Sequence, residues 1–179
     1  EPWLFGEEAL AIVKKYAVLR YRLFPYIRSA ALEAGLTGMP VLRALPLAFP
    51  DDPNGAAWDH EYMFGPSLLV APVIRRIADL DRRGGSCRGT PVFPVYLPPG
   101  EWIDRRTGRM HRGPVVVDAE SPLAVLPLFV RAGAILPMMR SATRIPEGPI
   151  DPLELEIYPA GASTGTLFEE EGRTDFRFE

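Results

Sequence analysis

The stretch Tyr62-Met63-Phe64-Gly65-Pro66-Ser67-Leu68-Leu69-Val70-Ala71-Pro72-Val73 marks a change in the pattern of the sequence. Before it, apolar residues recur at helical spacing, and from it onward they form short β-rich runs. Further runs of this kind lie at 92–97, 115–117 and 123–136, separated by proline, glycine and charged residues. Such runs are typical of strands joined by loops. Residues 63–139 are therefore predicted to form an antiparallel β-sandwich or barrel, with 79–90 as an exposed loop.

The residues before this stretch predict helix. Apolar side chains recur at the three- to four-residue spacing of one helical face, at Leu10, Val13, Ala17, Tyr21 and Phe24. Pro25 lacks a backbone donor, so we expect a kink or two abutting helices there instead of one straight rod. Gly35 and Gly38 are predicted to end the helical segment.

A nearly continuous apolar run follows the helix. Residues 39–49 include Val41, Leu42, Leu45 and Leu47. Runs without polar alternation are typical of strands that are buried on both faces, as in parallel sheets. The run is therefore predicted to be one parallel strand, and a helix followed by such a strand is the order of elements found in a β/α barrel.

The last part of the chain has strand patterns again. Residues 153–158 alternate between apolar and polar side chains, and 166–168 lead into the acidic turn Glu169-Glu170-Glu171-Gly172. Strict alternation predicts a half-buried strand, and the turn predicts a hairpin. We expect this region to be the beginning of a further β-domain that is cut short at Glu179.

Composition excludes several classes of function. The 20 basic and 23 acidic side chains give a formal charge of −3, which does not favour binding to nucleic acid or to an anionic membrane surface. No apolar run reaches the roughly 20 residues that span a bilayer. Cys87 is the single cysteine, and with only two histidines the sequence predicts neither a disulfide nor a metal site. No cofactor is predicted. A reducing compartment is allowed, which slightly favours the cytoplasm.

Several distinctive motifs occur in order along the chain. They are Glu1-Pro2-Trp3, Arg22-Leu23-Phe24-Pro25-Tyr26-Ile27, Gly38-Met39-Pro40-Val41-Leu42-Arg43-Ala44-Leu45-Pro46-Leu47, Phe49-Pro50-Asp51-Asp52, the stretch 62–73 quoted above, Tyr96-Leu97-Pro98-Pro99-Gly100-Glu101-Trp102-Ile103-Asp104 and Phe129-Val130-Arg131-Ala132-Gly133-Ala134-Ile135-Leu136-Pro137. Together they resemble the C-terminal part of glycoside hydrolase family 31. Several blocks in the right order are far less frequent by chance than one short motif. The members of this family are retaining α-glycosidases, mostly α-glucosidases and α-xylosidases.

The resemblance implies an α+β chain of three parts. Residues 1–64 would be the end of the catalytic (β/α)8 barrel, residues 65–139 the proximal antiparallel β-sandwich, and residues 140–179 the beginning of a distal β-domain. The acidic turn at 169–172 is similar to a hairpin of that distal domain, with glutamate where aspartate is more usual.

The resemblance also implies that the catalytic carboxyl groups lie outside this sequence. Retaining glycosidases need two of them, about 5 to 5.5 Å apart. In the family both are aspartates on barrel segments that precede the block matching Glu1-Pro2-Trp3. Trp102-Ile103-Asp104 is similar to the nucleophile motif, but the Arg105 and Arg106 that follow differ from it, and we expect Asp104 to be a structural turn residue. No catalytic residue is predicted here.

Four residues are candidates for contact with substrate. Trp3 precedes the helix, where its ring could stack on a sugar or pack in a loop. Arg43 lies in an apolar run and requires a carboxylate partner, either in a structural ion pair or at the active site. Asp51 and Asp52 follow the predicted barrel strand and either line a pocket or order their own loop.

Two functions follow from the sequence. The first is the C-terminal portion of a retaining α-glycosidase that acts on α-linked oligosaccharides, inactive by itself and partnered by a missing N-terminal barrel. The alternative is a free-standing, non-catalytic carbohydrate-binding or interaction β-module. The apolar front segment favours the first, because a self-contained module would not expose it.

Overall fold

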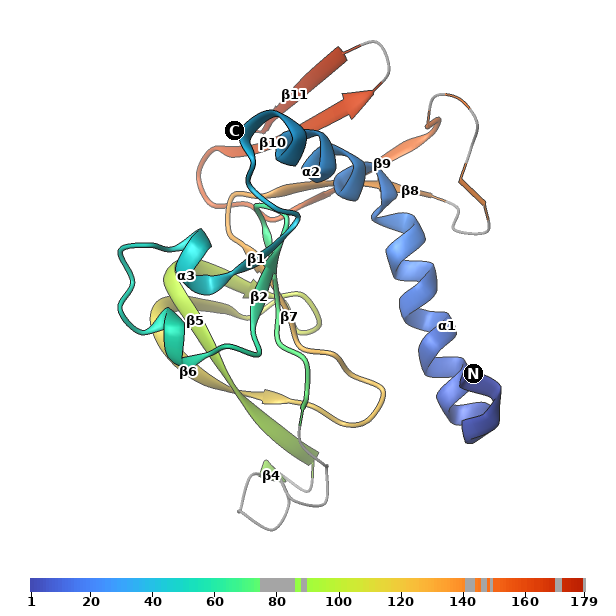
Figure 1. Cartoon of the computed structure of the whole chain (residues 1–179), viewed down its shortest axis with the longest axis vertical. Coiled ribbons are helices and arrows are strands. Elements are labelled where there is room, and N and C mark those ends of the chain that lie inside the picture. The colour runs from blue at the N-terminus through green and yellow to red at the C-terminus, as the bar shows by residue number, and fades with distance from the viewer. Residues whose placement is uncertain are drawn as a thin grey trace.

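Two consecutive helices form the N-terminal part of the chain (Figure 1). The computed structural model describes residues 1–74, 86–87, 90–140, 144–145, 148, 150–169 and 172–178. After a short 3-10 turn, η1 (Pro2–Phe5), helix α1 (Gly6–Arg22) leads into α2 (Phe24–Thr37). Pro25 lies in the first turn of α2, where its missing N–H would have no helical partner. The predicted pair of abutting helices is confirmed.

The end of α2 is set by one glycine. Gly38 adopts the left-handed conformation, with φ 78°, and its N–H donates to Ala34 O. Gly35 lies within α2, so the prediction that both glycines end the helix is right only for Gly38.

The predicted parallel strand at 39–49 is wrong. Only β1 (Leu42–Ala44) is extended, and it pairs antiparallel with β2 (Tyr62–Phe64). Residues Leu45–Ala48 form the short helix α3 instead. Pro46 explains the break, because proline cannot donate to a sheet but fits the first turn of a helix. A second 3-10 turn, η2 (Gly55–Ala57), precedes β2.

The main sheet is antiparallel throughout its described pairs. Its strand order is β1-β2-β3-β7-β5-β4, and β6 pairs with β5 outside this path. The remaining strands are β3 (Leu68–Val70), β4 (Ser86–Cys87), β5 (Thr90–Asp104), β6 (Met110–Glu120) and β7 (Leu128–Arg131). The long β5–β6 pair, which changes register between Leu97 and Gly100, runs along the lower part of Figure 1. Most of the predicted 79–90 loop lies outside the described residues.

Two smaller two-stranded sheets follow. Strand β8 (Ile135–Met139) pairs with β9 (Leu153–Ile157), and β10 (Ser163–Glu169) forms a hairpin with β11 (Gly172–Phe178). The predicted hairpin is confirmed, although residues 170 and 171 of its turn lie outside the described residues. The predicted domain boundaries after residues 64 and 139 are both bridged by strand pairs. Strand β2 pairs with β3 across the first boundary, and β8 pairs with β9 across the second. The division into three domains at these positions stays a prediction.

Two hydrophobic clusters form the core of the described part of the chain. The larger joins α3 to the strands β2, β3, β5, β6 and β7, and contains Trp102, which is fully buried. The second joins α1 and α2 to the β7–β8 region through Leu23, Tyr26, Val130 and Leu136. The hydroxyl of Ser29 in α2 also accepts a hydrogen bond from Phe168 N at 2.9 Å, which ties the β10–β11 hairpin to that helix.

Helix α1 is exposed along most of its length, and none of its residues is buried. Its large exposed apolar side chains, together with those of η1, are Trp3, Leu4, Phe5, Leu10, Val13, Val18 and Tyr21. In Figure 1 the N-terminus lies at the end of α1 that is farther from α2, while the Tyr16 hydroxyl in the middle of α1 donates to Ala124 O and accepts from Leu126 N. In the described part of the chain, no helix is both long and apolar enough to cross a bilayer.

The described part of the chain is mostly antiparallel β-structure with helices at its N-terminal side, as predicted.

Candidate functional site

The four predicted substrate contacts do not come together in one site. Trp3 lies in η1 with 60 % of its surface exposed, at the free end of α1. Arg43 is in β1, whereas Asp51 and Asp52 occupy the turn after α3. The structure therefore gives each of them separate surroundings, and contact with substrate stays a prediction for each.

Arg43 has the carboxylate partner that its apolar surroundings require. Its residue surface is 7 % exposed, its Nη2 lies 2.9 Å from Glu33 Oε2 in α2, and its Nε donates to Pro40 O at 2.9 Å. These bonds balance the guanidinium charge inside the chain. The geometry favours the structural ion pair among the two roles considered for Arg43.

The neighbouring aspartates differ in their surroundings. Asp51 is exposed, whereas Asp52 is buried. Asp52 Oδ1 accepts hydrogen bonds from Asn54 N at 3.1 Å and Asn54 Nδ2 at 3.3 Å, and its Oδ2 accepts one from the Tyr96 hydroxyl at 2.7 Å. Such bonds are typical of an aspartate that orders its own loop.

Glu61, which the sequence did not indicate as a candidate, lies beside this loop. Glu61 is 1 % exposed, and its Oε1 accepts a hydrogen bond from Tyr96 N at 3.0 Å. Burial raises the pKa of Glu61 to about 7, against the lowering effect of that N–H. One signal was available: Glu61 directly precedes β2, and the alternation of strand side chains places it on the same side as the buried Met63.

The resemblance of Trp102-Ile103-Asp104 to a nucleophile motif has a structural explanation. Trp102 is fully buried and its Nε1 donates to Pro98 O at 2.8 Å. Asp104 Oδ1 accepts hydrogen bonds from Arg106 N at 2.8 Å and Thr107 N at 3.3 Å. This is the geometry of an aspartate that closes a turn by bonding the backbone two residues ahead.

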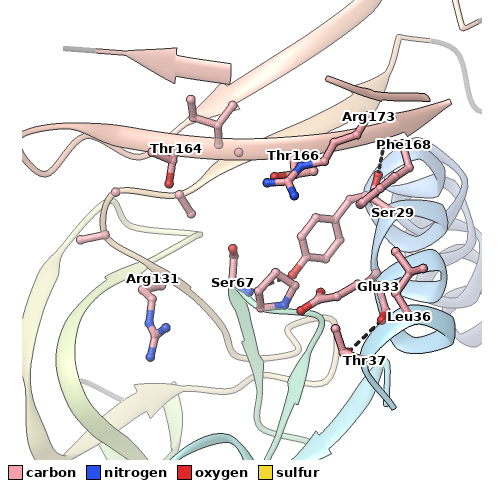
Figure 2. Close-up of a pocket in the computed structure, with 18 of the residues that line it drawn as sticks. Ser29, Glu33, Leu36, Thr37, Ser67, Arg131, Thr164, Thr166, Phe168 and Arg173 are labelled. Atoms are coloured by element: carbon pink, nitrogen blue, oxygen red, sulfur yellow. Dashed lines mark hydrogen bonds between the residues drawn. The ribbon is translucent and has the colours of Figure 1, made fainter. Parts of the chain in front are cut away.

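A cavity of about 650 Å³ lies between α2, the β7–β8 turn and β10. Figure 2 shows Ser29, Glu33 and Thr37 on its helical side and Thr164, Thr166 and Arg173 on the opposite side. Many of its polar side chains already bond within the chain. The bonds are Glu33 to Arg43, Thr37 to Glu33 O, Thr166 and Arg173 to Asp175, and Tyr26 to Phe64 O. The cavity walls thus combine polar groups that bond within the chain with others, such as the guanidinium of Arg131, which lies over the rings of Phe49 and Trp102.

Comparison with known proteins identifies the family. Residues 38–136 match the family described as "Glycosyl hydrolase family 31 C-terminal domain". An α-xylosidase of Saccharolobus solfataricus is 35 % identical over 97 % of this chain and 22 % of its own length. Alpha-glucosidase 2 of Bacillus thermoamyloliquefaciens is 32 % identical over 100 % of this chain and 21 % of its own.

Solved structures give the same result. The GH31 dextranase of Flavobacterium johnsoniae, in complex with isomaltotriose, aligns with TM-score 0.83 and 35 % identity over 97 % of this chain and 20 % of that chain. The GH31 α-xylosidase of Xanthomonas citri aligns with TM-score 0.77 and 31 % identity over 94 % of this chain and 17 % of its own. The chain spans about a fifth of the length of these relatives. Since the family description matches more than half of it, this chain belongs to glycoside hydrolase family 31.

Proposed function

We propose that this chain is the C-terminal portion of a retaining α-glycosidase acting on α-linked oligosaccharides. Residues 1–64 supply the last elements of the catalytic barrel, residues 65–139 the proximal β-sandwich, and residues 140–179 the start of the distal β-domain. The nucleophile and the acid/base, both carboxyl groups in this mechanism, are supplied by the preceding barrel. The chain alone is inactive.

The observation that carries this proposal is the exposed apolar side of η1 and α1. Leu10 and Val13 are 42 % and 46 % exposed, and Trp3, Leu4 and Phe5 are more exposed still. Several large apolar side chains exposed on one short segment are typical of a contact with another polypeptide segment. A preceding barrel would cover it, and the relatives, of which this chain spans about a fifth, have the additional length for such a barrel.

The proposal is tested by substituting this surface in the complete enzyme. Leu10→Asp places a charge against the covering segment, whereas Glu8→Gln changes the charge by the same amount at an exposed position on the other side of the same helix. We expect Leu10→Asp to remove most of the soluble, active enzyme and Glu8→Gln to leave it nearly unchanged. Equal behaviour of the two variants would contradict the proposed contact.

A direct assay separates the proposal from the alternative of a free-standing carbohydrate-binding module. The purified chain should hydrolyse neither an aryl α-glucoside nor an aryl α-xyloside. It should also give no heat of binding with isomaltotriose in titration calorimetry. Saturable binding by the isolated chain would favour the module.

A further inference from the structure

Tyr96 in β5 holds the segment 52–61 at three places. Its hydroxyl donates to Asp52 Oδ2 at 2.7 Å, and its backbone N–H donates to Glu61 Oε1 at 3.0 Å. Between them, the ring of Trp58 stacks on the Tyr96 ring with centroids 5.7 Å apart and planes at 14°. Both ends and the middle of the segment are therefore fixed to one residue of the sheet.

The bond at the Glu61 end is unusual because it uses a buried acid. The Glu61 side chain has no exposed surface, and Oε2 has no hydrogen-bond partner within the described part of the chain. An ionised carboxylate has about four acceptor sites and requires several donors when it is buried. With one backbone donor the ionised form is poorly compensated, which agrees with the raised pKa of this group.

His60 is the titratable group closest to this acid. Its Nε2 lies 3.7 Å from Glu61 Oε1 and is buried without a hydrogen-bond partner among the described residues. The ring is held between Trp58, at 5.8 Å, and Phe93, at 5.5 Å. On the opposite side, His60 Nδ1 lies 3.7 Å from the exposed carboxylate of Asp59.

The other groups that face Glu61 supply no compensating positive charge among the described residues. From β5 the only titratable neighbour described is Tyr96, whose pKa is raised by burial and by its bond to Asp52. From the 52–61 segment the neighbours are His60 and, through the Tyr96 hydroxyl, Asp52. Among the described residues no lysine or arginine forms an ion pair with Glu61.

We propose that protonated Glu61 acts as a proton-dependent latch that keeps segment 52–61 closed on β5. The proton is held on the Glu61 carboxyl group, so the closed form buries no charge at this position. Loss of that proton leaves a lone buried carboxylate with a single donor, and the segment loosens. The proposal depends only on these residues and not on the proposed enzymatic function.

The sign of the effect follows from proton binding. When the segment opens, Glu61 enters water and returns to an ordinary carboxyl pKa, so the open form binds the proton more weakly than the closed form. Between pH 5 and 7 the closed form therefore binds up to one proton more, and its stability relative to the open form decreases as the pH rises. A difference of one proton corresponds to a change of about tenfold per pH unit in the opening equilibrium.

Hydrogen exchange tests the latch in the protein without an activity assay. Mass spectrometry of peptides covering 52–61 and 93–97 is performed between pH 5 and 8, with correction for the intrinsic exchange rate. We expect protection to decrease by up to about tenfold per pH unit between pH 5 and 7. A peptide from α2 serves as an internal reference and should show no such decrease.

Two variants assign the effect to the buried acid. Glu61→Gln keeps the shape and the acceptor for Tyr96 N–H but cannot ionise, so its protection should not change with pH. Asp59→Asn removes the neighbouring exposed carboxylate, which has 93 % of its side chain in solvent, and should keep the wild-type decrease. A flat wild-type profile, a decrease that persists in Glu61→Gln, or its loss in Asp59→Asn would each overturn the latch. The wild-type profile decides the matter even where Glu61→Gln does not fold.

Discussion

Arg43 in β1 and Glu33 in α2 form an ion pair, with Nη2 and Oε2 2.9 Å apart, that joins the helical and β-sheet parts of the chain. The guanidinium side chain is 9 % exposed and that of Glu33 is 34 % exposed. Arg43 also donates to Pro40 O, so one residue fixes both the partner helix and the connection that follows it. The pair explains why a cation occurs inside an otherwise apolar run.

Removing one partner of this pair should destabilise the fold. Arg43→Leu deprives Glu33 of its donor, and Glu33→Gln leaves a nearly buried guanidinium without a compensating charge. Since Glu33 is partly exposed, we expect losses of about 1–3 kcal/mol in the free energy of unfolding, below the range for fully buried pairs. Urea denaturation of the complete enzyme measures this quantity.

An exposed ion pair provides the matched control. Arg106 and Glu120 lie 2.7 Å apart with side chains 45 % and 46 % exposed. Arg106→Leu should therefore cost less than about 1 kcal/mol. If Arg43→Leu leaves stability unchanged but raises KM for an aryl α-glycoside, the role of Arg43 is contact with substrate and the structural interpretation is wrong.

Gly65 and Tyr26 give a second prediction, on the packing of α2 against β2. Gly65 has φ +64°, and a Cβ placed on it would lie 2.5 Å from the Tyr26 hydroxyl oxygen. That hydroxyl donates to Phe64 O at 2.7 Å and accepts from Ser67 N at 3.0 Å, so it cannot move without losing two bonds. Gly65→Ala should lower the free energy of unfolding through the strain of the left-handed backbone, and by a further amount of about 1–3 kcal/mol through overpacking against Tyr26.

Gly108→Ala isolates the contribution of that contact. Gly108 has φ +73°, close to the value at Gly65, but no atom lies within 4 Å of its added Cβ. Gly108→Ala should therefore lower the free energy of unfolding only through backbone strain, by about 1–2 kcal/mol. Thermal or urea unfolding compares the two variants. Equal losses would show that the Tyr26 hydroxyl yields easily to the added methyl group.

Local signals in the sequence were enough for the helices and for the strand-rich region. Pro25 and Gly38 act through their own backbone chemistry, so the division of the helical segment and its end at Gly38 could be predicted from neighbouring residues alone. The prediction for 39–49 was wrong because an apolar run has the same pattern in a buried strand as in a short helix that is part of a larger interface. Pro46, at the start of α3, was the signal that distinguished them.

The surroundings of the polar residues could be predicted only in part. The need of Arg43 for a carboxylate follows from its apolar neighbours, but its partner Glu33 depends on how α2 turns back onto β1. Glu61 was missed because its burial depends on Tyr96, 35 residues later in the chain. Pairings across such distances are set by strand order, which a pattern of apolar residues does not specify.

Asp104 gives the prediction that bears directly on catalysis. Its Oδ1 closes the turn after β5 by accepting the N–H groups of Arg106 and Thr107. Asparagine retains this acceptor but cannot act as a nucleophile, so Asp104→Asn in the complete enzyme should keep kcat for aryl α-glucosides and α-xylosides within about twofold of the wild type. Removal of a true nucleophile lowers kcat by on the order of 10⁴ or more. Asp104→Ala should also keep kcat but lower the free energy of unfolding by about 1 kcal/mol, through loss of the turn bonds. A collapse of kcat in Asp104→Asn without loss of folded protein would make Asp104 the nucleophile and would place the chemistry in this chain.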